Sequence, residues 1–183
     1  NSVILTTKED GTAVTAYVEP QRALHCGAHT LNAILGRQAA AGPLYFYSDL
    51  RATGAPRTLP GDPITHYQST GMYTIRAINH WLHEHTNSDV MLTHVLTGSR
   101  NGEAGVAYTQ MEVLAAAPAG CRAFFLHVGD QQNGHYKAWM ECDGDWYECD
   151  SMACTASTLR IRRLSQDDWT TVTSQGATFY CLI

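Results

Sequence analysis

Lysine is scarce in this chain of 183 residues, where only Lys8 and Lys137 occur against ten arginines. Basic residues as a whole are outnumbered, with 12 Lys plus Arg against 17 Asp plus Glu and a formal net charge of -5. Phosphate affinity comes mainly from clustered Lys and Arg, so an acidic chain without a basic block is a poor nucleic-acid binder. Codon usage that favours Arg is the simplest explanation of the lysine count.

Long apolar runs are also missing. No run approaches the ~18–20 residues that a membrane helix needs, and the chain does not open on a signal peptide. The composition excludes intrinsic disorder, because 44% of the residues are hydrophobic and the net charge is small. The length predicts a single domain over residues 1–183.

Cysteine is too sparse for a scaffold held together by disulfides, with six residues in the whole chain. Cys121 and Cys181 lie inside apolar runs, where we expect a thiol to act as a small hydrophobic group. Cys142, Cys149 and Cys154 cluster without the CxxC spacing of a zinc site. We therefore expect a reduced, intracellular and cytoplasmic protein that needs neither a metal nor a cofactor.

Helical patterns dominate the first half of the chain. From Cys26, apolar residues recur at three- and four-residue spacing up to a stop at Gly36, and a second helix is predicted over 72–82. Residues 12–18 form a weak strand candidate. The stretch 37–70 alternates short apolar patches with turn signals and is interpreted as an irregular or partly helical excursion.

Strand patterns dominate the second half. The β runs, separated by turn residues, are 90–96, 123–128, 136–141, 146–149 and 178–183. A short helix over 165–173, capped by Ser165, is predicted between the last two runs. Helices first and an antiparallel sheet afterwards predict an α+β fold class.

Cys26 is the best candidate for chemistry because of its place at the start of the first helix. The free N–H groups and the dipole of a helix start favour a thiolate there. Gly27 leaves the sulfur uncrowded, and Gln21 can bring an amide donor to the same point.

His135 and Asp150 are predicted to lie together although they are 15 positions apart in the sequence. Asp143-Gly144 is a strong hairpin signal between the two strands that carry them. With arms of similar length, both residues fall at the open end of the hairpin. A carboxylate there can orient the imidazole while the other ring nitrogen faces a thiol. The arrangement predicted is Cys-His-Asp.

The other histidines receive structural interpretations. His25 and His29 flank Cys26, and we expect His29 to hydrogen-bond to a neighbouring loop. His80, His83 and His85 lack the HExxH pattern of a metalloprotease. We expect them to be a solvated helix end, where His complements the dipole.

A family resemblance rests on several motifs in order. Residues 21–35 read QRALHCGAHTLNAIL, which resembles the opening signature of Josephin-domain deubiquitinases: a Gln, four residues, the nucleophilic Cys, then a His and a Leu-Asn pair. The similarity continues through GMYTI, GHY, GDWYECDS and GATFY, which begin at positions 71, 134, 144 and 176. It spans almost the whole chain.

The resemblance implies a papain-like cysteine protease fold with an N-terminal catalytic helix, a helical lobe and a C-terminal antiparallel sheet. It makes Cys26 the nucleophile and His135 the general base and then acid. Asp150 becomes the orienting residue, at a position where the family often has Asn, and Gln21 becomes the oxyanion-hole donor.

The implied activity is hydrolysis of the bond after the C-terminal glycine of ubiquitin, or of a ubiquitin-like tail, through a thioester. The expected partner of this monomeric domain is ubiquitin or polyubiquitin. A tail ending in Gly-Gly implies a narrow channel, with Asn133, Gly134 and Tyr73 as substrate-binding candidates. The excursion over 37–70 stands where the family has an arm that gates access.

Two other functions stay open. A viral or bacterial protease with the same machinery could process a polyprotein or another host protein, and a module without activity could simply bind ubiquitin. A pathogen enzyme working in a host cytoplasm would gain from having few lysines, since each is a ubiquitin acceptor. The acidic balance likewise suits a partner such as ubiquitin, whose binding face is basic.

Overall fold

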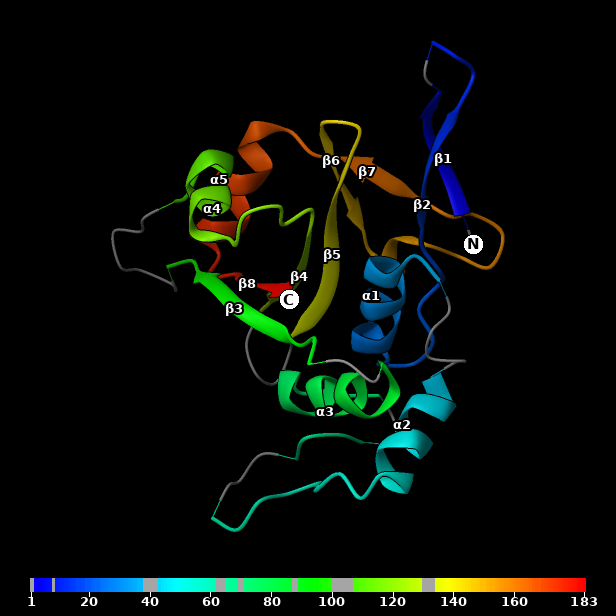
Figure 1. The fold of residues 1–183 in the computed structure, drawn as a ribbon, viewed down its shortest axis with the longest axis vertical. Coiled ribbons are helices and arrows are strands. Elements are labelled where there is room, and N and C mark those ends of the chain that lie inside the picture. The colour runs from blue at the N-terminus through cyan, green and yellow to red at the C-terminus, as the bar shows by residue number, and fades with distance from the viewer. Residues whose placement is uncertain are drawn as a thin grey trace.

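The structure is a computed structural model that describes residues 2–7, 9–37, 43–61, 65–68, 71–86, 89–99, 107–129 and 134–183. Within these ranges the chain forms five α-helices and two antiparallel sheets (Figure 1). The helices are α1 (Cys26–Leu35), α2 (Pro43–Ala52), α3 (Ile75–Thr86), α4 (Gln110–Ala116) and α5 (Gln166–Ser174). The expected α+β class is confirmed.

The larger sheet has six strands in the order β3-β8-β4-β5-β6-β7, and every neighbouring pair is antiparallel. Its strands are β3 (Leu92–Thr97), β4 (Ala123–Val128), β5 (His135–Cys142), β6 (Asp145–Cys149), β7 (Ile161–Arg163) and β8 (Thr178–Leu182). The smaller sheet is a hairpin of β1 (Ser2–Thr7) and β2 (Ala13–Tyr17), which stands at the upper right of Figure 1.

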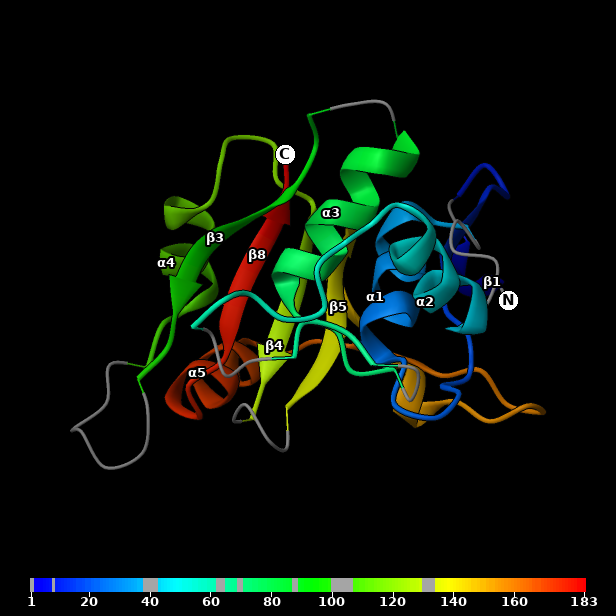
Figure 2. The same cartoon turned by 90° about the horizontal axis from the view of Figure 1, so that it is seen from below.

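Hydrophobic cores lie on both faces of the larger sheet, because successive strand residues point to opposite sides. On β4, Phe125 packs into the cluster formed with α1, α2 and α3. Its neighbours Phe124 and Leu126 pack into a second cluster with Trp169 of α5 and Val113 of α4. Figure 2 shows α1 and α2 on one side of the sheet and α4 and α5 on the other.

Most of the predicted elements are confirmed within a few residues. Helix α1 begins at Cys26 and ends before Gly36, whose φ of 67° is left-handed and closes the helix through backbone N–H bonds. Strand β4 has the predicted bounds, and Asp143 and Gly144, both with positive φ, form the turn between β5 and β6.

Other boundaries were wrong. Helix α3 begins three residues later than predicted, at Ile75, because Thr74 caps it with a hydroxyl that accepts from the N–H of Ala77. The opening stretch, for which no strand was predicted, pairs with β2 as strand β1. Helix α4 was also missed, although Thr109 and Glu112 form a capping box that is visible in the sequence.

The cysteines differ from the expectation of free apolar thiols. Cys121 and Cys181 form a disulfide, with Cα atoms 6.7 Å apart and a sequence separation of 60. The two residues meet because Cys181 on β8 pairs with Phe124 on β4, and Cys121 comes two residues before the start of β4 at Ala123. Cys26, Cys142, Cys149 and Cys154 are free, and the last two are buried.

Two further findings concern helices and the excursion. No described helix is long and apolar enough to cross a membrane.

Within 37–70, α2 packs against α3, where Phe46 stacks on Trp81. Its role in gating substrate access stays a prediction.

Candidate functional site

Cys26 is half-buried at the first position of α1, and this end of the helix is packed against β5. The packing is tight at the next residue, Gly27. A Cβ atom there would lie 3.2 Å from Cδ1 of Ile78 and 3.3 Å from Cδ2 of Tyr136. The absence of a side chain therefore lets the helix start lie directly beside the strand that begins at His135.

His135 lies between a thiol and a carboxylate. Its Nε2 is 2.7 Å from Oδ1 of Asp150, and Cys26 lies close enough to the same ring to contribute to the raised pKa of His135. Because Nε2 is taken by Asp150, Nδ1 is the nitrogen left for the thiol. The expected meeting of His135 and Asp150 at the open end of the hairpin is confirmed, while their catalytic roles stay a prediction.

His135 and Asp150 each stabilise the charged form of the other. Burial by itself would lower the pKa of His135, but the hydrogen bonds to Asp150 and Cys26 outweigh it and raise that pKa to about 9. Burial would raise the pKa of Asp150, yet the hydrogen bond to His135, helped by the Met152 N–H and the charge of Lys137, keeps that pKa below its usual value. The imidazolium and the carboxylate therefore coexist at neutral pH.

Gln21 is tied to the residue that follows Asp150. Its backbone N–H donates to the carbonyl of Ser151 at 3.0 Å, and the Ser151 hydroxyl donates to Oε1 of Gln21 at the same distance. With its oxygen held in this way, the Gln21 amide turns its NH₂ group toward the Ala23 carbonyl, which accepts at 3.0 Å. The amide donor is thus oriented toward the loop that leads into Cys26.

A buried polar network holds the start of that loop. Glu19, only 6% exposed, accepts from His29 Nδ1 at 2.6 Å and from Asn32 Nδ2 at 2.7 Å. The other ring nitrogen of His29 accepts from the backbone N–H of Arg22 at 3.0 Å. The expectation that His29 binds a neighbouring loop is confirmed. Both of its nitrogens are occupied, so His29 is poorly placed to act as a base.

Tyr73 braces the other flank of Cys26. It is 4% exposed, and its hydroxyl lies 2.7 Å from Nδ1 of His25. Its carbonyl accepts from the Tyr136 hydroxyl at 2.9 Å. Gly71, with φ of 109°, packs so closely that a Cβ atom would lie 2.6 Å from the backbone nitrogen of His25. Tyr73 therefore supports the residue next to the nucleophile, and its contact with substrate stays a prediction.

The remaining substrate-binding candidates precede β5 in the sequence. Gly134 is half-buried and directly precedes His135, whereas Asn133 lies outside the described residues. Two exposed apolar side chains belong to the segments joined by the contact between Gln21 and Ser151. Leu24, three residues after Gln21, is 51% exposed, and Met152, directly after Ser151, is 64% exposed.

The histidines of α3 are more engaged than expected for a solvated helix end. His80 Nε2 lies 3.0 Å from the Thr53 hydroxyl, and His85 stacks on Trp81 and pairs with Asp49 at 3.7 Å. The reason is that α2 packs against this part of α3. His83 and His85 are both exposed, as the solvated interpretation expects, and only His85 of these two has the contacts with Trp81 and Asp49.

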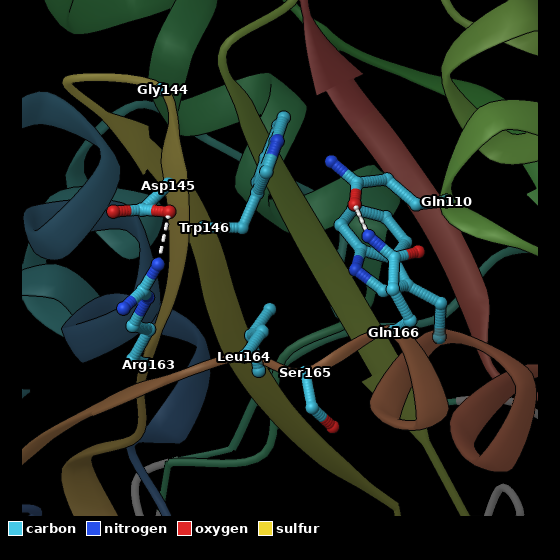
Figure 3. A pocket seen from close by; sticks show the side chains of 9 residues that line it. Gln110, Gly144, Asp145, Trp146, Arg163, Leu164, Ser165 and Gln166 are labelled. Carbon is cyan, nitrogen blue, oxygen red and sulfur yellow. Dashed lines mark hydrogen bonds and ion pairs between the residues drawn. The ribbon is translucent and has the colours of Figure 1, made fainter.

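A cavity of 610 Å³ lies away from the candidate triad (Figure 3). It opens beside Gly144, at the turn between β5 and β6, whereas His135 and Asp150 lie at the open end of that hairpin. Trp146 lines it, and an ion pair between Arg163 and Asp145 borders it. In the described parts of the chain, no three His, Cys, Asp or Glu side chains are grouped so as to hold a metal ion.

Sequence reasoning missed several residues of the site. Ser151 and Glu19 each bind a residue that had been singled out, and Tyr73 had been assigned to substrate rather than to His25. Ser151 directly follows Asp150 in the GDWYECDS motif, which was the available signal. The contacts of Glu19 with His29 and of Tyr73 with His25 depend on the tertiary fold, and sequence spacing does not reveal them.

Comparison with models of known protein families and with characterised proteins finds no match to this chain.

Proposed function

We propose that the chain is a thiol hydrolase of the papain-like class, with Cys26 as nucleophile, His135 as base and acid, and Asp150 as the orienting carboxylate. The observation that carries the proposal is the imidazole of His135, whose Nε2 lies 2.7 Å from Asp150 while Cys26 at the start of α1 contributes to its raised pKa. A thiol, an imidazole and a carboxylate in this order are what nucleophilic acyl transfer requires.

The reaction follows from the proton positions. His135 holds the proton of Cys26 as an imidazolium, and the Cys26 thiolate adds to the scissile carbonyl to form a C–S bond. The NH₂ group of Gln21 and the backbone N–H of Cys26 stabilise the negative oxygen, and each such donor is worth ~3 kcal/mol in comparable hydrolases. The intermediate collapses as the C–N bond breaks and His135 protonates the leaving amine. Water, deprotonated by His135, then releases the acid from the thioester.

More specifically, we propose a deubiquitinase of the Josephin type that cleaves after the C-terminal glycine of ubiquitin or of a ubiquitin-like protein. The ordered motifs from residue 21 to residue 180 support this substrate. The exposed side chains of Leu24 and Met152 support it as well, because they offer apolar contacts near the site for residues upstream of a Gly-Gly end. The net charge of -5 is complementary to a basic partner.

The test is a ubiquitin derivative with an electrophile in place of its C-terminal carboxylate. We expect the protein, kept reduced, to form a one-to-one covalent adduct, with the modified peptide containing Cys26 and not the half-buried free thiol Cys142. Iodoacetamide provides the parallel measurement of thiol reactivity without ubiquitin.

The two measurements separate the candidate functions. Selective alkylation of Cys26 without a ubiquitin adduct would contradict the ubiquitin substrate and favour a protease that processes other proteins. Ubiquitin binding without a reactive Cys26 would contradict the enzyme and favour a binding module. An adduct at Cys26 together with cleavage of ubiquitin chains is the expected result.

Ser151 provides a smaller, specific prediction about the oxyanion hole. Replacing Ser151 by alanine removes the hydroxyl that holds Oε1 of Gln21, so the amide can rotate away. We expect Ser151→Ala to lower kcat about tenfold with little change in KM, and Gln21→Ala to lower it by about 100-fold or more. Ser151→Thr keeps the hydroxyl and is the matched control. Equal activities of Ser151→Ala and the wild type would show that this bond does not orient Gln21.

A further inference from the structure

One of the two lysines of the chain lies on the strand that carries His135. The Lys137 ammonium is 2.6 Å from Oε1 of Glu148, and both side chains are mostly buried, with 17% and 12% exposure. On its far side Glu148 binds Arg162 at 3.3 Å, and Arg162 binds Asp168 of α5 at 2.7 Å. Charges of alternating sign therefore form a row across β5, β6, β7 and α5.

The near end of this row is Asp150. Ala138 on β5 pairs with Cys149 on β6, so the next step of this register brings Lys137 opposite Asp150. Glu148 and Asp150 are two residues apart and thus point to the same side of the chain. The Lys137 charge acts on Asp150 across this short gap. Its ammonium accordingly stands between two carboxylates, one paired with it and the other paired with His135.

We propose that Lys137 is a positioning residue of the same site, whose ammonium offsets the carboxylates of Asp150 and Glu148 and so sets the net charge that His135 experiences. The inference rests on the proposed triad. Without Lys137, the Asp150 carboxylate that binds His135 would lose the influence of this positive charge, and Glu148 would keep only its ion pair with Arg162. Without the Glu148 charge, the ammonium would face the imidazolium with only Asp150 to balance it.

Few charged groups face His135 from the elements packed around it. Cys26 faces it from α1, Asp150 from the end of β6, and β4 places the uncharged Val128 opposite it. His127, the neighbour of Val128, lies against the ring of Tyr136. Lys137 and Glu148 are thus a pair of opposite charges whose removal should move the titration of His135 in opposite directions.

The experiment is an NMR titration of the His135 ring Cε1–H, assigned by its loss in His135→Ala. In the wild type we expect a midpoint near the raised pKa of about 9. Lys137→Met should move the midpoint up by about half a pH unit, and Glu148→Gln should move it down by about as much, as expected for a unit charge several ångströms away. Lys137→Arg keeps the charge and should leave the midpoint in place. The double variant Lys137→Met/Glu148→Gln should return it to the wild-type position.

The signs of the shifts decide the outcome. If Lys137 served only to keep the strands packed, both single variants would loosen the bond between His135 and Asp150, and both midpoints would fall. Two downward shifts, or no shift in Lys137→Met, would overturn the inference while leaving the triad intact. A wild-type midpoint near the ordinary value of 6.5 would instead count against the triad itself. The titration needs no ubiquitin, so it is independent of the proposed substrate.

Discussion

Cys26→Ala is expected to abolish both the covalent adduct with the ubiquitin probe and the hydrolysis of ubiquitin chains. The substitution removes the only sulfur that bonds to the His135 imidazole among the described residues, and no thioester can form without it. Loss of the nucleophile in a triad costs on the order of 10⁴-fold or more in kcat. The measurement is the steady-state rate of chain cleavage, with adduct formation followed by intact-protein mass.

Cys142→Ala is the matched control, because Cys142 is also a free and half-buried thiol but belongs to the turn end of β5. This variant should keep the activity of the wild type. Folding of Cys26→Ala is verified by its melting temperature, which should change little since Cys26 is only half-buried. Substantial cleavage by Cys26→Ala would rule out the thioester mechanism.

His135→Ala is expected to reduce turnover by about 10³-fold or more. The thiol then has no base to take its proton, and the leaving amine has no acid, and each of these transfers typically contributes 10²–10⁴-fold. The wild type should also lose activity as the pH rises through about 9, because the imidazolium that protonates the leaving group is then lost. His135→Ala should lack this alkaline decline, and profiles of kcat against pH for the two proteins measure it.

Two other histidines serve as comparisons. His83→Ala changes an exposed residue of α3 and should be neutral. His29→Ala leaves Glu19 buried without its strongest partner, so it should lower the melting temperature while the surviving folded protein keeps the alkaline decline. If His29→Ala removed that decline and His135→Ala retained it, the assignment of the base would be wrong.

The raised pKa of His135 also links pH to stability. A group whose pKa is higher in the folded chain stabilises the fold below its unfolded value of about 6.5 and loses that contribution as pH rises through the folded value. Asp150 has the opposite sign, since its lowered pKa stabilises the fold above its usual value and less as the pH falls. The ion pair is therefore most stabilising between the two, in the range where the proposed reaction runs.

The lysine scarcity has a structural side. Lys137 is mostly buried and paired with Glu148, which leaves it a poor acceptor for modification, and Lys8 lies outside the described residues.

The sequence by itself determined the local features of this protein. Period-3.6 apolar spacing and a glycine located α1, and with it Cys26 at a helix start, because helix caps and stripes depend on near neighbours. The Asp143-Gly144 turn set the register between β5 and β6, and through it the meeting of His135 with Asp150. These inferences succeed because a hairpin is a local structure whose geometry follows from its turn.

Only the tertiary structure decided the contacts between segments far apart in the chain. The tie between Gln21 and Ser151 spans 130 residues, the bond of Tyr73 to His25 spans 48, and the disulfide of Cys121 with Cys181 spans 60. Such contacts depend on how the sheet and helices pack, and many sequences can satisfy the same packing. The three residues of the candidate triad could therefore be predicted from local patterns, whereas the residues that hold them in place emerged only from the folded structure.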